Sequence, residues 1–598
     1  MDNGSRRKEY ESKIVALAEE SAQLEKISFR YSIFRLAIIL LLVVVILGLW
    51  NTGPLYIVIA TLIGVALFLY ILKQHQHVQH QISYQQAMIE IMENEINLSA
   101  FKPGSYYNGK LYNNDSHLYT GDLDVYGRHS LYEQLNRAKS YHGNVYLHNR
   151  LSSKGSFHDV KRHQEATMEL VNQPAWRHDF QAILWNTESA HDFNHYDYLF
   201  KSLQLDTDFA YKPWVKWLTP ALPIAWTALG ILAYLGWPYA SVIGSALFII
   251  TLCIYFTYFT KISAVQSQLT QCKQILGPYS EAIQHIRNFS WQAPLNQEYL
   301  ASIGNKNSSS GLARLGSLLD KLDYRLNFIV GTFLNLGFFW DFHIVRKIQE
   351  WKDNNGDEME SIFDCIGHME LITSMSTYGY NHNGYSFPDV SNEAFLFQGK
   401  DVKHPLIDPL QSVGNDINFQ SEPGVRIITG SNMSGKSTLL RTMGTNMVLA
   451  YAGTVCSGKN LHISHQDIFS YMRIKDALEE NVSTFKAELN RIQLMLDRLK
   501  QDNNVVLLID EMLRGTNSKD KLKGSISITQ KLMDQDAQAF IATHDLQLAE
   551  YVDGKTDLPA NYFFDISFQD GELEFDYKLK EGICSNFNAS FLLAKMGL

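Results

Sequence analysis

Two pairs of long apolar segments interrupt an otherwise mixed chain, and a short turn joins the members of each pair. The first pair covers residues 36–50 and 55–72, and the second covers residues 218–236 and 239–259. None of these segments contains a charged residue, and each is close to the length that a helix needs to cross the hydrocarbon core of a bilayer. The pattern therefore predicts four transmembrane helices arranged in two hairpins.

Buried core helices are an alternative interpretation of these apolar segments. The alternative is stronger for the second pair, because Pro220 and Pro223 interrupt its first segment. A cleaved signal peptide is disfavoured, because a polar stretch precedes the first segment and a second apolar segment follows without a small-residue cleavage site. Spanning hairpins account best for the pattern.

Charged residues beside the apolar segments predict their orientation. Basic side chains flank both pairs and are absent from both turns: Arg30, Arg35, Lys73, Lys212, Lys216 and Lys261. By the positive-inside rule, both hairpins enter the membrane from the cytoplasm and return to it. Trp50, Trp214, Trp217 and Trp237 lie near segment ends, where an interfacial aromatic belt places them. The expected location is the cytoplasmic (inner) membrane, as a multi-pass protein with the N-terminus and the large polar parts in the cytoplasm.

The polar stretches next to the first hairpin have helical periodicity, over residues 9–32 and 74–96. The aromatic run 328–342 could be a further membrane segment, but Asn335 and Asp341 within it favour a buried core helix. The predicted organisation is a cytoplasmic amphipathic helix (1–33), hairpin 1 (34–73), a helical linker with the first part of a helical core (74–210), hairpin 2 (211–261), the second part of the core (262–395) and a C-terminal domain (396–598).

Composition narrows the function classes. The chain has 598 residues, of which 46% are apolar and 19% charged, and its formal net charge is −10. Several structural units are expected from this length, and the negative charge argues against a generally basic, nucleic-acid-coating surface. Five cysteines without a CxxC pair indicate free thiols, not a disulfide framework or a zinc site.

A phosphate-binding loop is the strongest chemical signal in the chain. The loop fits the pattern GxxxxGK[ST] between a short apolar strand, 425–428, and a helix-compatible run, 438–443. In this pattern backbone N–H groups surround phosphate oxygens at a helix N-terminus. Lys436 is expected to reach the β- and γ-phosphates of ATP, and the Ser437 hydroxyl is expected to bind Mg²⁺. The predicted nucleotide-binding residues of the loop are Gly430, Ser431, Asn432, Met433, Ser434, Gly435, Lys436, Ser437 and Thr438.

Two further strands supply acidic and imidazole groups in the order that an ATPase needs. The apolar strand 505–509 ends in Asp510 and Glu511, and the apolar run 539–543 ends at His544. In a parallel sheet, both ends would lie at the same edge as the phosphate-binding loop. Asp510 is expected to hold Mg²⁺ and Glu511 to orient the attacking water, while His544 could sense the γ-phosphate. Glu511, Lys436 and His544 are therefore the predicted catalytic residues.

Several motifs together resemble the MutS family. The loop from Thr429 to Thr438 is similar to the family sequence TGPNMGGKST, with Ser431 and Ser434 as departures. Other resemblances are His404-Pro405, Asn415-Asp416, Ser483-Thr484-Phe485 with Glu488, Asp510-Glu511 with Arg514-Gly515-Thr516, and Ala542-Thr543-His544. Leu513 stands where the family usually has glycine. A weaker resemblance to the helical core of the family begins near residue 119 and ends near residue 374.

The resemblance implies a fold, a reaction and a partner. The fold class is an α/β P-loop ATPase domain with a parallel sheet flanked by helices, an all-α MutS-like core, and the four transmembrane helices. The implied activity is Mg²⁺-dependent hydrolysis of ATP by a homodimer, in which Ser483 and Thr484 contact the nucleotide of the opposite subunit. The mismatch-reading and connector domains of the family have no counterpart in the sequence, and a hairpin occupies their place.

Three functions are compatible with this sequence. The favoured one is a membrane-anchored ATPase in which ATP-driven dimer closure moves the helical core and the hairpins, with membrane lipid and an unknown membrane-side partner as contacts. The alternative is a membrane-tethered clamp on mismatched or branched DNA. A transporter subunit is disfavoured because the LSGGQ signature is absent. The spacing of His191 and His195 suits zinc on a helix, but no third ligand accompanies them.

Overall fold

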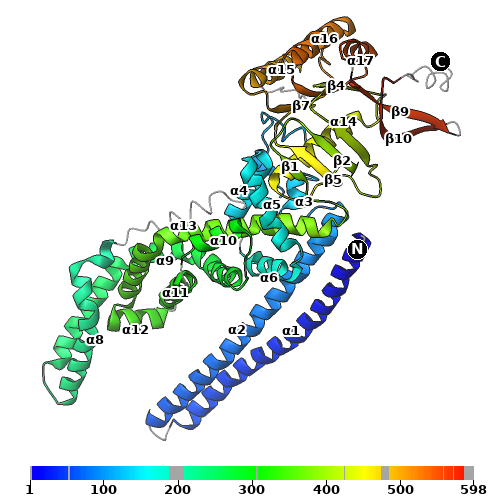
Figure 1. Ribbon diagram of the computed structural model, residues 1–598. Coiled ribbons are helices and arrows are strands. Elements are labelled where there is room, and N and C mark those ends of the chain that lie inside the picture. Colours follow the sequence, from blue (N-terminus) through cyan, green and yellow to red (C-terminus); the bar gives the residue numbers. More distant parts are fainter. Residues whose placement is uncertain are drawn as a thin grey trace. The chain divides into compact units, whose positions relative to one another are not determined.

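The computed structural model describes residues 3–50, 54–187, 208–304, 307–326, 328–422, 424–472, 484–556, 558–569 and 572–584 (Figure 1). The chain forms two compact units. Unit 1 comprises Met1–Arg137, Tyr146–Arg177 and Leu371–Leu598, and unit 2 comprises Ala138–Val145 and His178–Glu370. His191 and His195 lie outside the described residues, so the structure does not test the zinc interpretation.

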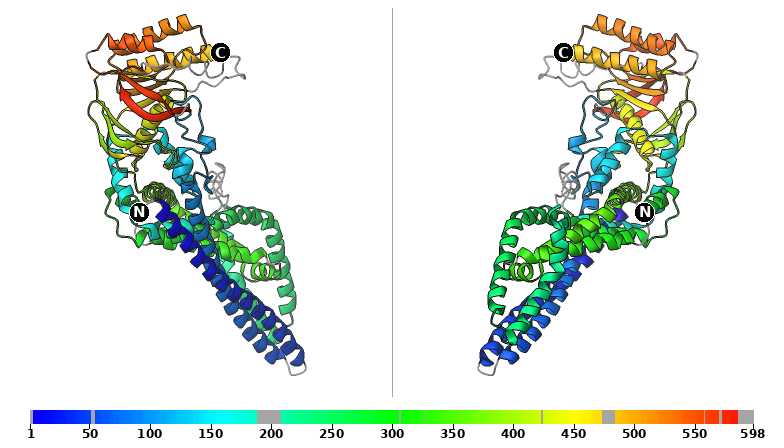
Figure 2. Two further views of the ribbon diagram at one scale, coloured as in Figure 1. Left: turned by 90° about the vertical axis from the view of Figure 1, so that its right-hand side faces the viewer. Right: turned by 90° about the vertical axis from the view of Figure 1, so that its left-hand side faces the viewer.

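Unit 1 begins with two long helices, α1 (Asn3–Gly48) and α2 (Pro54–Ser99), which lie side by side along their length (Figures 1 and 2). Each helix contains one apolar segment and the polar, amphipathic stretch next to it. Within each helix, the two parts are continuous. Pro54 opens α2, where its fixed φ suits a first helical position and its missing N–H costs nothing. The predicted hairpin turn at residues 51–53 lies outside the described residues.

A buried ionic group ties the polar ends of α1 and α2 to the rest of unit 1. Glu95 of α2 accepts two hydrogen bonds from the Arg137 guanidinium, at 2.6 and 2.7 Å, and one from the Asn381 amide at 2.6 Å. Tyr10 of α1 donates to the same amide group at 2.9 Å. Glu95 and Arg137 are almost completely buried, so their bidentate pairing compensates for the loss of water.

A six-stranded sheet forms the centre of unit 1, in the order β10-β9-β4-β8-β7-β6. The neighbouring strands from β9 to β6 are all parallel, while β10 pairs antiparallel with β9. The bounds are β4 (Val425–Thr429), β6 (Asp467–Tyr471), β7 (Val505–Asp510), β8 (Gln538–Ala542), β9 (Asn561–Gln569) and β10 (Glu572–Glu581). The sheet is therefore mixed, because an antiparallel edge strand follows the predicted parallel set.

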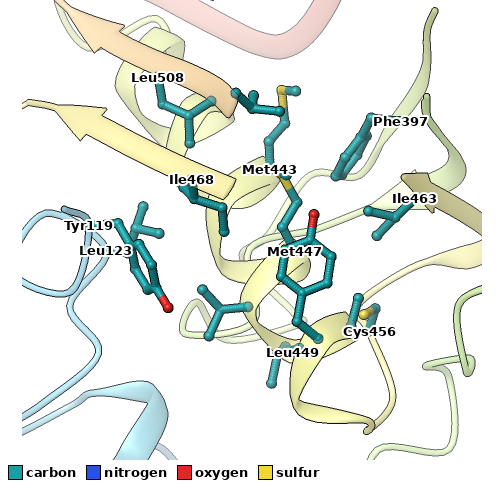
Figure 3. Packing of buried hydrophobic residues seen from close by; sticks show 14 of the residues in the cluster. Tyr119, Leu123, Phe397, Met443, Met447, Leu449, Cys456, Ile463, Ile468 and Leu508 are labelled. Atoms are coloured by element: carbon teal, nitrogen blue, oxygen red, sulfur yellow. The ribbon is translucent and has the colours of Figure 1, made fainter. Parts of the chain in front are cut away.

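Apolar side chains cover both faces of this sheet. Alternate residues of β7 point to opposite sides: Leu508 packs in one cluster and Leu507 in the other. Figure 3 shows the first cluster, where Met443 and Met447 lie near Leu508 and Ile468. The flanking helices are α14 (Lys436–Ala452), α15 (Thr484–Gln501), α16 (Ser518–Asp534) and α17 (Leu546–Asp553). Burial on both faces explains why the central strands β7 and β8 are almost entirely apolar in sequence.

A second, four-stranded sheet has the order β1-β5-β2-β3; three of its strands precede the phosphate-binding loop in sequence, and β5 follows it. Its strands are β1 (Asp389–Ser391), β2 (Phe397–Val402), β3 (Asn415–Phe419) and β5 (Lys459–Ser464). The sequence patterns predicted no such sheet, because its strands are short and half-exposed. The shorter helices before it are η1 (Lys110–Tyr112), α3 (Leu131–Leu135), α4 (Tyr141–Ser152), α5 (Phe157–Val171) and α6 (Pro174–Trp185).

The described part of unit 2 is helical. It contains η2 (Asp208–Tyr211), α8 (Pro213–Tyr234), α9 (Ala240–Arg287), α10 (Pro294–Ser302), α11 (Asn307–Leu322), η3 (Asp323–Leu326), α12 (Phe328–Phe338) and the first part of α13 (Trp340–Asn381). Helices α8 and α9 form the second apolar pair, and α8 remains helical through Pro220 and Pro223. Among the described residues, α1, α2, α8 and α9 are long and apolar enough to cross a membrane.

The interpretation of residues 328–342 as one buried helix is wrong. The helix ends at Phe338, the backbone of Phe339 has a left-handed φ of 46°, and α13 begins at Trp340. Phe333 and Phe338 are exposed, whereas Asn335 is buried. The polar residues that suggested a soluble core therefore face inward, as do Phe339 and Phe342, while Phe333 and Phe338 face outward.

Candidate nucleotide site

The phosphate-binding loop connects the end of β4 to the start of α14 and depends on two glycines with positive φ. Gly430 has a φ of 146° and Gly435 a φ of 112°. A Cβ atom on Gly430 would lie 2.7 Å from the Ser434 hydroxyl, so a larger residue does not fit there. Gly435 is the N-cap of α14. The loop thus presents a helix N-terminus, which favours anions.

The side chain of Lys436 folds back over the loop. Its ammonium group donates to the backbone carbonyls of Gly430 and Ser431 at 2.9 and 2.7 Å. Burial lowers the pKa of Lys436 to about 8, while the carboxylates of Asp510 and Glu511 act in the opposite direction. The cation is therefore partly desolvated and held at the position where a polyphosphate would meet it.

The other loop residues differ in exposure. Ser434 is buried and Ser431 half-buried, so the two departures from the family loop are small residues that the packing accommodates. Asn432, Met433 and Thr438 are exposed, and Met433 has 86% of its surface accessible at a φ of 67°. The asparagine–methionine pair thus faces outward from the loop.

The two predicted Mg²⁺ ligands are in contact with each other. The Ser437 hydroxyl donates to a carboxylate oxygen of Asp510 at 2.7 Å. Hydroxyl and carboxylate oxygens are the donors that Mg²⁺ prefers, and the ion takes its remaining ligands from phosphates and water. No cluster of three or more His, Cys, Asp or Glu side chains suited to a metal occurs among the described residues. The donor set fits Mg²⁺ bound together with a nucleotide.

The parallel pairing of β7 with β8 brings Glu511 and His544 together. Asp510 is in register with Ala542, and the Glu511 amide donates to the Ala542 carbonyl at 3.0 Å. One carboxylate oxygen of Glu511 lies 3.0 Å from Nε2 of His544, and the other lies 3.1 Å from Nε of Arg514. Burial lowers the pKa of His544, the Lys436 cation lowers it further, and Glu511 opposes both. The Glu511 carboxylate is thus held between the His544 imidazole and the Arg514 guanidinium.

Backbone geometry after β7 has a special feature. Glu511 and Leu513 have φ values of 51° and 58°, in the left-handed region. Leu513, which replaces the family glycine, therefore adopts a conformation that glycine takes more readily. The buried Glu488 carboxylate accepts from the amides of Arg514 and Gly515, at 3.2 and 3.5 Å, and so holds the next turn in place.

Sequence reasoning missed three contributions to the site. Arg514 was noted for its motif, but not as an ion-pair partner of Glu511. Tyr577 of β10 lies beside the loop: a Cβ atom on Gly435 would be 3.4 Å from its ring. Phe564 of β9 also borders both loop glycines. No local pattern indicates that β9 and β10 return to the loop; the only available hint was Asn415, whose amide binds the backbone of Tyr577 and Leu579.

The predicted contacts to an opposite subunit stay predictions. Ser483 lies outside the described residues, and Thr484 is the first residue of α15, with no description of its side chain. His404, from the predicted His-Pro motif, is buried, and burial lowers its pKa to about 4. His404 is therefore a structural residue of unit 1 that stays neutral at physiological pH.

Comparison with known proteins identifies this region. The family model for MutS domain V matches residues 426–595. The chain is 28% identical over 247 residues to "Endonuclease MutS2" of Lactiplantibacillus plantarum, with 40% of this chain and 30% of that protein covered. It is 29% identical over 246 residues to "DNA mismatch repair protein MutS" of Aquifex pyrophilus, covering 40% and 28%. For the protein of the same description from Thermotoga maritima, the identity is 32% over 196 residues, covering 32% and 24%.

The matched parts amount to less than a third of the length of these three relatives. The residues that the family model matches include the loop, the acidic strand end and the histidine that the structure brings to one edge of the six-stranded sheet. Over residues 426–595 the chain is therefore similar to domain V of MutS-family proteins.

Proposed function

We propose that the protein is a membrane-anchored, MutS-type ATPase that hydrolyses ATP at the edge of the six-stranded sheet. The observation that carries the proposal is the joint position of Lys436, the Ser437–Asp510 pair and the Glu511–His544 pair around one loop. A buried cation, two oxygen donors and an oriented carboxylate are the groups that phosphoryl transfer to water requires.

The residues of the site suggest a sequence of exchanges when ATP binds. Lys436 would leave the carbonyls of Gly430 and Ser431 and donate to phosphate oxygens instead. Glu511 would keep its hydrogen bond to His544 and use its second oxygen, now paired with Arg514, to accept from the attacking water. Mg²⁺, when bound by Ser437 and Asp510, supplies positive charge that stabilises the transferred phosphoryl group.

Membrane anchoring is the second part of the proposal. The apolar segments of α1, α2, α8 and α9 are almost wholly exposed in the structure. In the apolar 18-residue stretch of each helix, 0%, 0%, 6% and 11% of the residues are buried, respectively. Exposed apolar helices of this length in water would aggregate, whereas a bilayer covers them. The flanking basic residues orient both hairpins with their ends in the cytoplasm of an inner membrane, where the ATPase domain then lies.

Dimer closure is the proposed use of the ATP cycle. MutS-family proteins generally act as dimers, and the segment that resembles the trans-acting family signature begins next to α15. Two domain V units facing each other would complete both nucleotide sites, and their closure would move the helical core and the hairpins. A membrane-side partner of unknown identity would receive this motion.

A second candidate function is a membrane-tethered clamp on DNA. It is favoured by the names of the relatives, which are a mismatch repair protein and an endonuclease. Such a clamp would bind mismatched or branched duplexes through phosphate contacts, and its affinity would fall steeply with salt.

ATP turnover by the full chain in nanodiscs, with and without mismatched or branched duplex DNA, tests these alternatives. Turnover that Lys436→Ala abolishes and DNA leaves unchanged supports the membrane ATPase. Stimulation by DNA that disappears as salt rises supports the clamp. Turnover that persists in the Lys436→Ala variant would reject the assignment of the site.

A further inference from the structure

Helices α8, α9 and α12 of unit 2 line an apolar cavity of about 610 Å³ that is open on one side. Its walls include Pro223 and Trp226 of α8, Phe248 of α9, and Phe333, Gly337 and Phe338 of α12. This volume lies within the range of about 300–1,000 Å³ that is usual for small-molecule sites. The cavity is separate from the nucleotide site, which belongs to unit 1.

Two of the three polar side chains of the wall are engaged within the protein, and the third, Thr332, has a buried hydroxyl. The indole N–H of Trp226 donates to the Leu336 carbonyl at 3.1 Å. That carbonyl is in the last turn of α12, where carbonyls lack helical partners, so the tryptophan satisfies it and attaches α12 to α8. The Thr227 hydroxyl donates to the carbonyl of Pro223, at 2.8 Å, within its own helix. An occupant therefore meets mainly hydrocarbon and aromatic surface, which favours a hydrocarbon occupant.

Around α12, several polar side chains are buried while some large apolar side chains are exposed. Asn335, Asp341 and Arg325 are buried beneath the helix, where Arg325 and Asp341 form an ion pair at 3.0 Å. The Asn335 side chain accepts from the Asp341 amide at 3.0 Å. Phe333, by contrast, has 69% of its surface exposed. Polar groups inside and apolar groups outside is the arrangement of a helix that faces lipid.

The position of the cavity along the hairpin is consistent with lipid contact. Trp226 and Phe248 both lie eight residues from the turn end of their helices. At 1.5 Å per residue this is about 12 Å, which falls inside a hydrocarbon core about 30 Å thick. In a spanning hairpin, the molecules available at this depth are lipid acyl chains.

From these observations we infer that the α8–α9–α12 cavity is a binding site for the acyl chain of a bilayer lipid. The inference rests on the membrane arrangement of the proposed function. Helix α12 then acts as a short, membrane-embedded wall, held to α8 by Trp226 and to α13 by Asn335. Binding of a chain between the helices would fill the space that close helix packing leaves open.

Photocrosslinking of the full chain tests this inference. The chain is reconstituted into phosphatidylcholine vesicles that contain a phosphatidylcholine with a diazirine in one acyl chain, and adducts are mapped by mass spectrometry. We expect adducts on Trp226, Phe248 and Phe333 in excess of those on Val242 and Ile249, exposed residues of α9 that serve as the reference for general lipid contact.

A matched pair of glycine variants separates the cavity from the surrounding surface. A Cβ atom on Gly337 or on Gly230 meets no atom within 4 Å, so both positions accept a larger side chain, but only Gly337 lines the cavity. Gly337→Phe should remove most of the cavity adducts, whereas Gly230→Phe should keep them. If Gly337→Phe does not fold, Phe338→Ala enlarges the cavity instead and should increase the adducts.

Each outcome has a distinct meaning. Two outcomes would overturn the acyl-chain site and leave membrane anchoring intact. In the first, Val242 and Ile249 form adducts and the cavity wall forms no more than they do. In the second, Gly337→Phe leaves the wall adducts unchanged. The absence of adducts on all of α8 and α9 would overturn the membrane arrangement itself, and the site with it. Excess wall adducts that Gly337→Phe alone removes support the inference.

Discussion

The nucleotide edge of the six-stranded sheet differs from the helices around the cavity in where polar and apolar side chains lie. These helices are α8, α9 and α12, with Arg325 of η3 and Asp341 of α13, and are called the cluster below. In the sheet, the apolar strands are buried, and the half-buried Glu511 and the exposed Arg514 lie at the edge. In the cluster, Asp341 and Arg325 are buried, and Phe333 is exposed. The difference fits the membrane arrangement proposed above, in which water surrounds the nucleotide edge and lipid surrounds the cluster.

The largest expected effect concerns the buried ion pair of the cluster. Asp341→Ala leaves the Arg325 guanidinium buried without its carboxylate, and should destabilise the chain by about 3–5 kcal/mol. Thermal unfolding of the full chain in detergent measures the loss. The double variant Arg325→Met/Asp341→Leu removes both charges, so it should be clearly more stable than Asp341→Ala. Equal stability of Asp341→Ala and the wild type would show that the cluster interior is open to water, and the contrast between the two regions would fail.

The next effect concerns the charged edge of the sheet. Lys436→Ala removes the cation that phosphate oxygens would meet, and should lower ATP turnover by about 10²–10³-fold, as the loss of a preorganised donor does in other enzymes. Stability should change little, because the lysine is desolvated and its short hydrogen bonds go only to loop carbonyls. A steady-state ATPase assay together with thermal unfolding distinguishes the two effects. A large loss of stability with normal turnover would assign Lys436 a structural role only.

A charge on the outer face of α12 tests the medium directly. Phe333→Lys should be neutral if water surrounds the cluster, but should cost about 2.5–3.5 kcal/mol if the position lies in the bilayer centre. The matched control is Leu410→Lys in unit 1, where the leucine is 95% exposed. The fraction of chain recovered in the membrane after expression measures the difference. Equal recovery of both variants would contradict lipid contact at α12.

The smallest expected effect is a pH dependence of ATP binding. Burial lowers the pKa of Lys436 to about 8, and a bound phosphate raises it again because it favours the ammonium form. Below pH 8 the lysine is already protonated, so affinity is nearly constant. Above pH 8 binding must take up a proton, so affinity should fall by up to about tenfold per pH unit.

Calorimetric titration in buffers of different ionisation enthalpy measures this proton uptake. Lys436→Arg is the matched control, because a guanidinium stays protonated across the whole range. Its affinity should therefore not depend on pH above 8 in this way. Proton uptake that persists in the arginine variant would assign the linkage to another group, of which His544 is the nearest.

The two regions also differ in how far the sequence predicts them. At the nucleotide edge, spacing alone predicts which residues meet, because a parallel sheet brings the ends of β4, β7 and β8 to one side whatever the details of packing. Arg514 and Tyr577 escaped prediction, since one depends on a left-handed turn after Glu511 and the other on a distant antiparallel strand. Such contacts have no periodicity that a sequence can reveal.

In unit 2, the sequence predicts the apolar segments of α8 and α9 but not their packing. Pro220 and Pro223 suggested an interruption, yet α8 remains helical through both. Asn335 and Asp341 suggested a soluble core, because hydropathy cannot tell whether a polar residue faces inward or outward. The side toward which it faces is decided by tertiary partners, here Arg325. Predicting α12 correctly would have required knowledge of the medium as well as the sequence.

The length of the first helical pair sets a distance in the proposed membrane arrangement. Helix α2 has 46 residues, which span about 69 Å at 1.5 Å per residue, while the hydrocarbon core accounts for only about 30 Å. Glu95 is near the C-terminal end of α2. At the same rise per residue, it therefore lies roughly 30 Å above the lipid tails. The α1–α2 pair is thus a rigid spacer, and its bidentate clamp to Arg137 fixes the height at which that part of unit 1 is carried above the bilayer.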